Sequence, residues 1–406
     1  MLSWSPPNLP PLHYDVPSLE LRDSYSRKLH RVSDSGIYVC GITPYDSTHL
    51  GHAATYITFD LIARYLFASG KLPKRTQNVT DIDDPLLERA NRDGFDWTEL
   101  STSQIQLFRD DMTSLRVIPP SHYLGVVENM NLILGYIGRL VNTGITYDID
   151  GDIYLDLSLV PGALEKLPQS LPESIEIFRT RGGDPDRSGK RHPLDTLIWM
   201  KNRVGEPYWE GPYGRGRPGW HIECVALALS SLDEGKNISI AIQGGGNDLR
   251  FPHHYMTGVQ ALALTSRQFS EIYVHTGMIG LNGEKMSKSR GNLIFVGKLL
   301  RDGVDPMALR LALMNRRYSD DFMWNENYLK DAAHFLSRLR SALSREESAP
   351  TLPVITALTA ALSQDLDTPK ALGEIEQWCY RTESGEVGGN PGELSRAIDA
   401  LLGIAL

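Results

Sequence analysis

Two histidines, three cysteines and a lysine-rich pentapeptide are the side chains of this sequence best suited to chemistry. His49 and His52 flank a glycine shortly after an apolar run, Ile37 to Cys40, that is typical of a buried strand. A strand that passes into a helix at a glycine favours phosphate binding, because free helix N–H groups point at the turn. Imidazoles add donors for phosphate oxygens. We therefore expect a nucleotide phosphate site here, with the Cys40 thiol beside it.

A second group of side chains suits a metal ion. Cys40, Cys224 and His253 all fall at predicted strand ends or helix starts that face one crevice of a parallel sheet. Two thiolates and one imidazole form a three-ligand zinc site with an open fourth position, the arrangement of reactive zinc. The alternative is that both cysteines are ordinary core residues and that His253 and His254 begin a solvated helix.

Two glycine-rich segments are candidates for ligand contact. Gly244 to Gly246 form either a tight turn or a place where the backbone approaches a ligand closely. Lys285 to Ser289 (KMSKS) lie between Gly283 and Gly291 and form either an exposed basic loop or a mobile clamp over a triphosphate. The pattern GxxxxGK[ST] is absent from the sequence, so Walker-type chemistry is unsupported.

The elements that position these groups alternate between strand and helix. The strand 37–40 precedes a helix from about 51 to 69, which Gly70 closes. A second strand, 72–80, precedes a helix that Asp84 and Pro85 begin. This rhythm predicts an α/β fold with a doubly wound parallel, Rossmann-like catalytic domain.

The regular alternation of strand and helix stops near residue 116, which predicts an inserted subdomain over 116–192. We expect it to contain a helix from Leu124 to Val141 and a hairpin from Tyr147 to Leu157 that turns at Asp150-Gly151. We expect the central sheet to resume near Thr196 to Met200 and to gain strands at 238–242 and 271–276. A C-terminal helical domain follows. The predicted domains are an arm with short strands (1–35), two catalytic halves (36–115 and 193–303) around the insertion, and the helical domain (304–406).

Composition places the chain among ordinary globular proteins. It has 406 residues, 41% hydrophobic and 22% charged, with a net charge of -9. The proline-rich N-terminus lacks the layout of a signal peptide, and no apolar run approaches the roughly 18 residues of a membrane span. Three cysteines in so long a chain suggest a reducing compartment. We therefore expect a cytoplasmic protein with no membrane partner. A monomer is also expected, although no sequence pattern sets the oligomeric state.

The sequences THLGH and KMSKS together resemble the two ATP-binding motifs of class I aminoacyl-tRNA synthetases. Over about residues 19–330, the chain resembles the cysteinyl-tRNA synthetase branch. The motifs that carry this resemblance are Cys40-Gly41, Asn78 to Asp81, Gly219 to Cys224, Gly244 to Leu249 and Phe251 to His254.

Within this branch, the mycothiol-pathway ligases that join cysteine to glucosaminyl-inositol are the more similar family. Gly41 to Thr48 and Asp83 to Ala90 resemble those ligases. Thr257 stands where synthetases usually carry a glutamate beside the metal, and no anticodon-binding domain follows the helical region. Tyr255 departs from the ligase pattern, which has glutamate after the histidine pair.

The resemblance implies a two-step reaction in which ATP and L-cysteine give cysteinyl-adenylate and pyrophosphate, and the amine of glucosaminyl-inositol then releases AMP. It implies Mg²⁺ with ATP, and one Zn²⁺ whose fourth ligand is the substrate thiolate; tRNA is not expected as a partner. A cysteinyl-tRNA synthetase without an anticodon-binding domain and a non-catalytic binding module are the alternatives. The implied residues are His49, His52, Lys285 and Lys288 for catalysis; Cys40, Cys224 and His253 for the metal; and Cys40, Gly41, Ile42, Thr43, Gly51, Thr55, Asn78, Val79, Thr80, Trp220, Gly246, Asn247, Asp248, Ile279 and Ser287 for ATP and adenylate.

Overall fold

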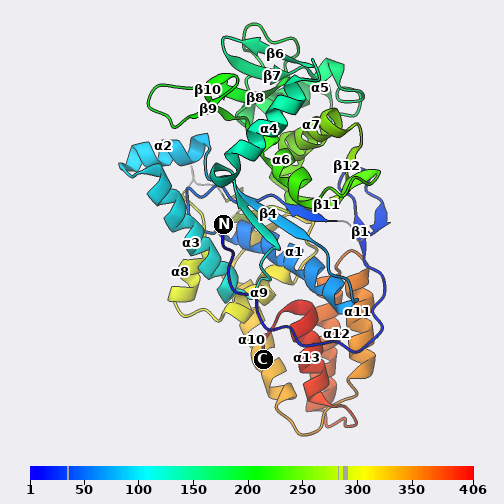
Figure 1. Ribbon diagram of the computed structural model, residues 1–406. Helices are drawn as coiled ribbons and strands as arrows, with labels where there is room; N and C mark the ends of the chain where they lie inside the picture. The colour runs from blue at the N-terminus through cyan, green and yellow to red at the C-terminus, as the bar shows by residue number, and fades with distance from the viewer. Residues whose placement is uncertain (34–35, 282, 287–290) are drawn as a thin grey trace.

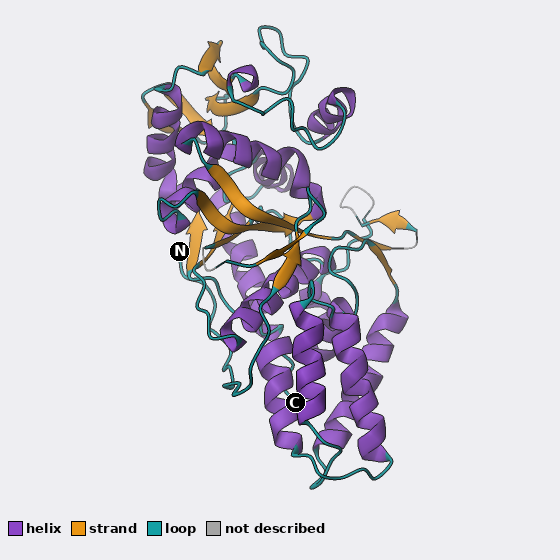
Figure 2. Ribbon diagram, turned by 90° about the vertical axis from the view of Figure 1, so that its right-hand side faces the viewer, coloured by secondary structure: helices purple, strands orange, loops and turns teal. Residues whose placement is uncertain are grey.

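The centre of the molecule is a five-stranded parallel sheet with the strand order β12-β11-β3-β4-β5 (Figure 2). The computed structural model describes residues 1–33, 36–281, 283–286 and 291–406. Strand order runs outward from β3 in both directions, which is the doubly wound arrangement predicted from the sequence. The strands are β3 (Ile37–Val39), β4 (Arg75–Val79), β5 (His122–Gly125), β11 (Ile238–Gly246) and β12 (Gln268–Thr276).

Two hydrophobic cores lie on opposite faces of this sheet. Ile37 and Val39 of β3 belong to one core, whereas Tyr38 and Cys40 belong to the other, because successive side chains of a strand point to opposite faces. The first core joins the sheet to α1 and the C-terminal helices, and the second joins it to α6, α7 and the insertion. These helices cover the two sides of the sheet in Figure 1. The helices around the sheet are α1 (Leu50–Ala68), α2 (Asp84–Asp93), α3 (Trp97–Ser114), α6 (Trp220–Leu232) and α7 (Tyr255–Thr265).

The insertion is built on a second, antiparallel sheet with the order β6-β7-β8-β10-β9. The predicted hairpin is confirmed, and Asp150 and Gly151 both have positive φ, 57° and 96°, at its turn. The elements are β6 (Thr146–Ile149), β7 (Asp152–Leu155), β8 (Thr196–Lys201), β9 (Trp209–Gly211), β10 (Gly214–Pro218), α4 (Met130–Val141) and α5 (Leu171–Thr180).

Two sequence predictions about this region are wrong. Thr196 to Met200 do not rejoin the central sheet, because β8 pairs antiparallel with β7. An apolar run cannot by itself tell a parallel strand from a buried antiparallel one. Leu124 lies in β5, the edge strand of the central sheet, and the helix predicted to start there begins at Met130.

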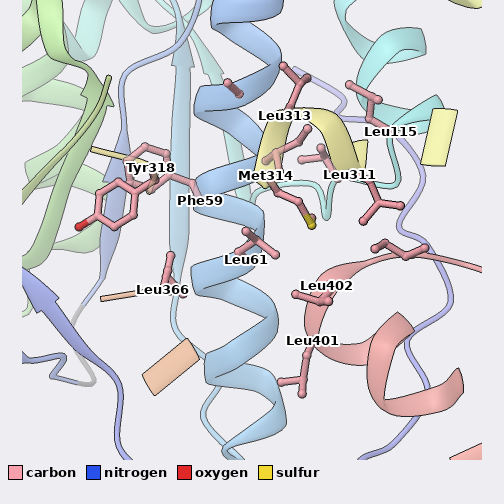
Figure 3. Packing of buried hydrophobic residues seen from close by; sticks show 14 of the residues in the cluster. Phe59, Leu61, Leu115, Leu311, Leu313, Met314, Tyr318, Leu366, Leu401 and Leu402 are labelled. Carbon is pink, nitrogen blue, oxygen red and sulfur yellow. The ribbon is translucent and has the colours of Figure 1, made fainter. Parts of the chain in front are cut away.

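The C-terminal region is helical, as predicted, apart from a small sheet of order β14-β13-β15. Leu311, Leu313 and Met314 of α9 pack around α1 together with Leu401 and Leu402 of α13 (Figure 3). The elements are β13 (Ile279–Leu281), β14 (Glu284–Lys285), β15 (Phe322–Trp324), α8 (Val296–Arg301), α9 (Pro306–Met314), α10 (Glu326–Leu343), α11 (Leu352–Ser363), α12 (Thr368–Glu383) and α13 (Pro391–Leu402).

The N-terminal arm has no helix or strand before β1 (Glu20–Arg22), which pairs with β2 (Leu29–Arg31). The arm is anchored in the interior by one of its side chains. Trp4 is buried with its ring edge-on to Phe108 and Tyr123, and its indole N–H donates to the Val117 carbonyl at 2.7 Å. Among the described residues, no helix has both the length and the apolar character that a membrane crossing requires.

Candidate active site

A cavity of about 820 Å³ opens at the carboxyl ends of the central strands. The residues that follow β3 and β4 form its floor, and Gly246 and Asp248 at the end of β11 lie beside them. The insertion supplies the opposite wall, including Arg181 to Asp184. This is the edge at which open α/β sheets bind ligands.

His49 and His52 both line the cavity. The hydrogen bonds of His49 show which of its ring nitrogens carries the proton. His49 is the N-cap of α1, and its Nδ1 accepts the main-chain N–H groups of Gly51 at 3.1 Å and His52 at 3.4 Å. The proton of the neutral ring therefore resides on Nε2. A Cβ on Gly51 would lie 2.9 Å from the His49 ring, so glycine allows the imidazole to lie across the helix start.

This cap changes the phosphate prediction. The N–H groups of Gly51 and His52 serve His49, and the N–H of Leu50 donates to the Ile294 carbonyl at 3.0 Å. The expectation that these main-chain N–H groups are free is therefore wrong. The two imidazoles lie at this turn, stacked with ring centroids 3.8 Å apart. Burial and the neighbouring His49 lower the pKa of His52 well below its ordinary value, so this ring is neutral at pH 7.

The start of the cavity floor requires glycine at position 41. A Cβ on Gly41 would lie 1.5 Å from the carbonyl oxygen of Asn78. The Gly41 N–H donates to Asn78 Oδ1 at 2.8 Å, and the Asn78 amide donates to Thr80 Oγ1 at 3.1 Å. These bonds join the ends of β3 and β4, and fix the backbone on which a ligand would rest.

Cys40, Cys224 and His253 converge as the sequence predicted. Their ligand atoms all lie within 4.8 Å of one another, and all three residues are buried. The two Sγ atoms are 3.9 Å apart, and His253 Nε2 lies 3.3 Å from Cys224 Sγ. The hydrogen bond with Cys40 and the nearby His253 lower the pKa of the Cys224 thiol, whereas burial raises that of Cys40. Two sulfurs and one imidazole nitrogen at this spacing fit the donor preference of zinc.

Two contacts to Cys40 were not foreseen. Gln243 Nε2 donates to Cys40 Sγ at 3.3 Å, and His254 Nε2 lies 3.2 Å from the same sulfur. His254 Nδ1 is 2.7 Å from His275 Nε2, which continues the polar chain behind the thiol. The histidine pair in the sequence was the available signal, because both rings are buried rather than solvated. Side chains such as Gln243 and His254, which contact the sulfur without binding the metal themselves, orient a metal-binding thiolate.

The glycine run 244–246 lies inside β11 rather than in a turn after it. A Cβ on Gly244 would lie 2.1 Å from the Phe59 ring, and only Gly246 of the three lines the cavity. The run therefore serves helix–sheet packing at one end and the cavity at the other. Asp248, just beyond it, lies 3.6 Å from Arg181 of the insertion.

Trp220 and Asp83 line the cavity next to the cysteine–histidine group, and Glu223 is buried outside the lining. The Trp220 ring stacks on His253 with centroids 4.1 Å apart. Asp83 lines the cavity, and burial raises its pKa to about 6. Glu223, adjacent to Cys224, is fully buried, and burial raises its pKa well above the ordinary value.

The remaining predicted residues divide into three groups. Val79 and Asn247 do not line the cavity; Val79 is buried in β4. Lys285 is described only as backbone of β14, and Ser287 and Lys288 lie outside the described residues. Those at the cavity wall are Cys40, Gly41, Ile42, Thr43, Gly51, Thr55, Asn78, Thr80, Trp220, Gly246, Asp248 and Ile279.

Comparison with known proteins identifies the family. Residues 28–334 match the model for the tRNA synthetases class I (C) catalytic domain. An L-cysteine:1D-myo-inositol 2-amino-2-deoxy-alpha-D-glucopyranoside ligase from Gordonia bronchialis is 49% identical over 416 residues, with both chains fully covered. The ligase of that name from Streptomyces griseus is 51% identical over 374 residues, which cover 91% of this chain and 90% of the relative.

Solved structures support the fold. Methionyl-tRNA synthetase of Mycobacterium tuberculosis, in complex with methionyl-adenylate, aligns with a TM-score of 0.63 at 14% identity, over 91% of this chain and 92% of the other. A leucyl-tRNA synthetase of Agrobacterium radiobacter aligns with a TM-score of 0.65 at 11% identity, over 91% and 83%. The chain therefore belongs to the family of L-cysteine:1D-myo-inositol 2-amino-2-deoxy-alpha-D-glucopyranoside ligases, which carries the class I synthetase catalytic domain.

Proposed function

We propose that this chain joins the carboxyl group of L-cysteine to the amine of glucosaminyl-inositol, with cysteinyl-adenylate as the intermediate. The observation that carries the proposal is a single cavity with two distinct ends. His49 and His52 lie at one end, and two cysteines and a histidine that could bind a metal lie at the other. The curated relatives bear the name of a ligase for these two substrates. A non-catalytic binding module would not need both ends intact.

The first step places a carboxylate oxygen on the α-phosphorus of ATP and releases pyrophosphate. Its barrier is electrostatic, because both partners are negatively charged. The N–H group at Nε2 of His49 donates to a phosphate oxygen. The hydrogen bond that Nδ1 accepts from the main chain fixes the orientation of the ring in advance. His52 stacks against it, and Lys285 and Lys288 offset the charge on the β- and γ-phosphates. Magnesium accompanies ATP.

The substrate thiol is recognised at the metal end. Cys40, Cys224 and His253 hold zinc, which when bound supplies a Lewis-acid site for the thiolate of cysteine. Trp220 fixes the His253 ring by stacking, and Asp248 offers a carboxylate to the substrate ammonium group. A pocket that senses size alone separates cysteine from serine by only about 1–3 kcal/mol, so a thiolate-selective site removes the need for editing.

In the second step the acceptor amine attacks the acyl carbon and loses a proton, and AMP leaves with the electrons of the carbon–oxygen bond of the acyl–phosphate anhydride. We propose that the acceptor is the amino sugar and not tRNA. The described lining of the cavity has seven carboxylates and four arginines, which offer hydrogen-bond acceptors and donors to the hydroxyl groups of an amino sugar. The cytoplasmic location and the monomeric state stay predictions.

The test has two stages. Exchange of labelled pyrophosphate into ATP must depend on cysteine and not on serine, and AMP release must then depend on glucosaminyl-inositol. Cysteinylation of tRNA at a comparable rate, with the sugar inert, would assign the chain to the synthetases instead.

The metal assignment has its own matched control. Cys224→Ala should lose one equivalent of zinc per chain and most cysteine-dependent exchange, whereas Cys379→Ala should keep both. Cys379 is the third buried cysteine and lies in α12, outside the cavity lining. Purified protein without stoichiometric zinc, or normal exchange by Cys224→Ala, would overturn the assignment.

A further inference from the structure

The wall of the cavity nearest the metal-binding residues carries an ion-pair cluster that neither ATP nor cysteine uses in the proposed function. Arg217 of β10 contacts Asp84, the first residue of α2, and lies 3.3 Å from Glu206. Arg203 lies 3.7 Å from Asp84. Asp84, Arg203 and Arg217 all line the cavity, whereas Glu206 is behind them. In Figure 1, α2 and the β9–β10 hairpin of the insertion both lie at the left of the molecule.

The location of the cluster separates it from the nucleotide end. His49, His52 and the strand ends of β3, β4 and β12 make the end assigned to ATP. Asp83 precedes Asp84 and lies within electrostatic range of both Arg217 and His253. Arg217 also shortly precedes Trp220, which stacks on His253, so the cluster is close to the donor set proposed to hold the substrate thiol.

The chemistry of the cluster suits a polyhydroxylated ligand. The Arg217 side chain is only 7% exposed, and its Nε is buried without a hydrogen-bond partner among the described residues. The Asp84 side chain is 46% exposed, so its carboxylate is open to the cavity. A hydroxyl group both donates and accepts, and a guanidinium beside a carboxylate offers it an acceptor and a donor in charge-assisted geometry.

We infer that Asp84 and Arg217 form the acceptor subsite and bind hydroxyl groups of the cyclitol part of the acceptor, with Glu206 orienting the guanidinium. This assignment rests on the proposed function, in which the acceptor is an amino sugar joined to inositol. Asp84 accepts from one ring hydroxyl, and Arg217 donates to its neighbour. The amine then lies on the Asp83 side, toward the metal-binding residues.

The test compares two acceptors, glucosaminyl-inositol and glucosamine, which lacks the cyclitol. Asp84→Asn should lower kcat/KM for glucosaminyl-inositol by about tenfold to a hundredfold, the loss expected for a charge-assisted hydrogen bond. The reaction with glucosamine and the pyrophosphate exchange should fall far less. Arg217→Lys, which keeps the charge but loses the planar fork, should show the same selective loss.

Glu210→Gln is the matched control. Glu210 pairs with Arg215 at 2.8 Å on the same β9–β10 hairpin, but neither residue lines the cavity. Equal losses with both acceptors, or no loss with either, would overturn the subsite. Failure of the unmodified protein to release AMP in response to the sugar would instead overturn the proposed function, so the two failures are distinguishable.

Discussion

Replacement of Asp60 by asparagine should destabilise the fold strongly, although Asp60 lies outside the cavity. Asp60 is fully buried in α1 and accepts hydrogen bonds from Arg64 Nε at 2.7 Å, from Arg310 of α9 and from the Ile118 N–H at 2.7 Å. Burial alone would raise the pKa of Asp60, but the charges of Arg64 and Arg310 hold it below its ordinary value. The carboxylate is therefore the counter-ion of two buried guanidinium groups.

The size of the effect depends on the contacts that Arg64 and Arg310 keep after Asp60 is replaced. Arg64 also donates to the Asp399 carbonyl, and Arg310 donates to the Leu402 and Leu115 carbonyls. These bonds hold both guanidinium groups in the interior, so neither side chain can turn out to solvent easily. Removal of one partner from a buried ion pair costs about 3–5 kcal/mol, because the other charge stays buried without compensation. We expect Asp60→Asn to lower the free energy of unfolding by that amount.

Urea unfolding followed by circular dichroism measures this change. Asp302→Asn is the matched control, because the Asp302 side chain is 59% exposed and its pair with Lys298 should be worth less than about 1 kcal/mol. An Asp60→Asn protein within about 1 kcal/mol of the unmodified protein would refute the reasoning. The arginines would then be neutralised by some other group.

Three further predictions concern the site and the sheet. Gly41→Ala should slow adenylate formation about a hundredfold in pyrophosphate exchange, because the new Cβ meets the Asn78 carbonyl oxygen and shifts the floor of the cavity; an unchanged rate would contradict this. Lys285→Ala should lower the exchange rate about 10²–10³-fold at saturating ATP, whereas an effect on KM alone would mean that the lysine binds ground and transition states equally. Burial raises the pKa of Asp81 to about 6, so the folded chain binds this proton more tightly than the unfolded chain and stability falls by about 3 kcal/mol as the pH rises from about 4 to about 6. Asp81→Asn should flatten this part of the urea-unfolding profile, and an unaltered slope would exclude Asp81 as its source.

Sequence reasoning located the parts of the site that lie on regular elements. The run from Ile37 to Cys40 and the helix after His49 have clear periodicity, so the fold class and the edge of the sheet that binds ligands followed from them. Cys40, Cys224 and His253 could be grouped because each lies at the same edge of a parallel sheet.

Contacts between distant segments could not be predicted in the same way. The partner of β8 depends on strand pairing, and its apolar pattern fits either sheet. Arg217 becomes a cavity residue only because β10 places it beside α2. The arm is anchored through Trp4, an aromatic residue close to several prolines, whose burial no local pattern indicates.

The division of the molecule into two cores has a consequence for how such a protein can evolve. The groups assigned to ATP lie on the central sheet and α1, whereas the wall assigned to the acceptor comes from α2 and the inserted sheet. Mutations that reshape the inserted sheet leave the packing between α1 and the C-terminal helices intact. The nucleotide end of the cavity can therefore be inherited unchanged while the wall beside the acceptor is remodelled, whereas Cys40 and Cys224 share the second core with the inserted sheet and constrain how far it can change.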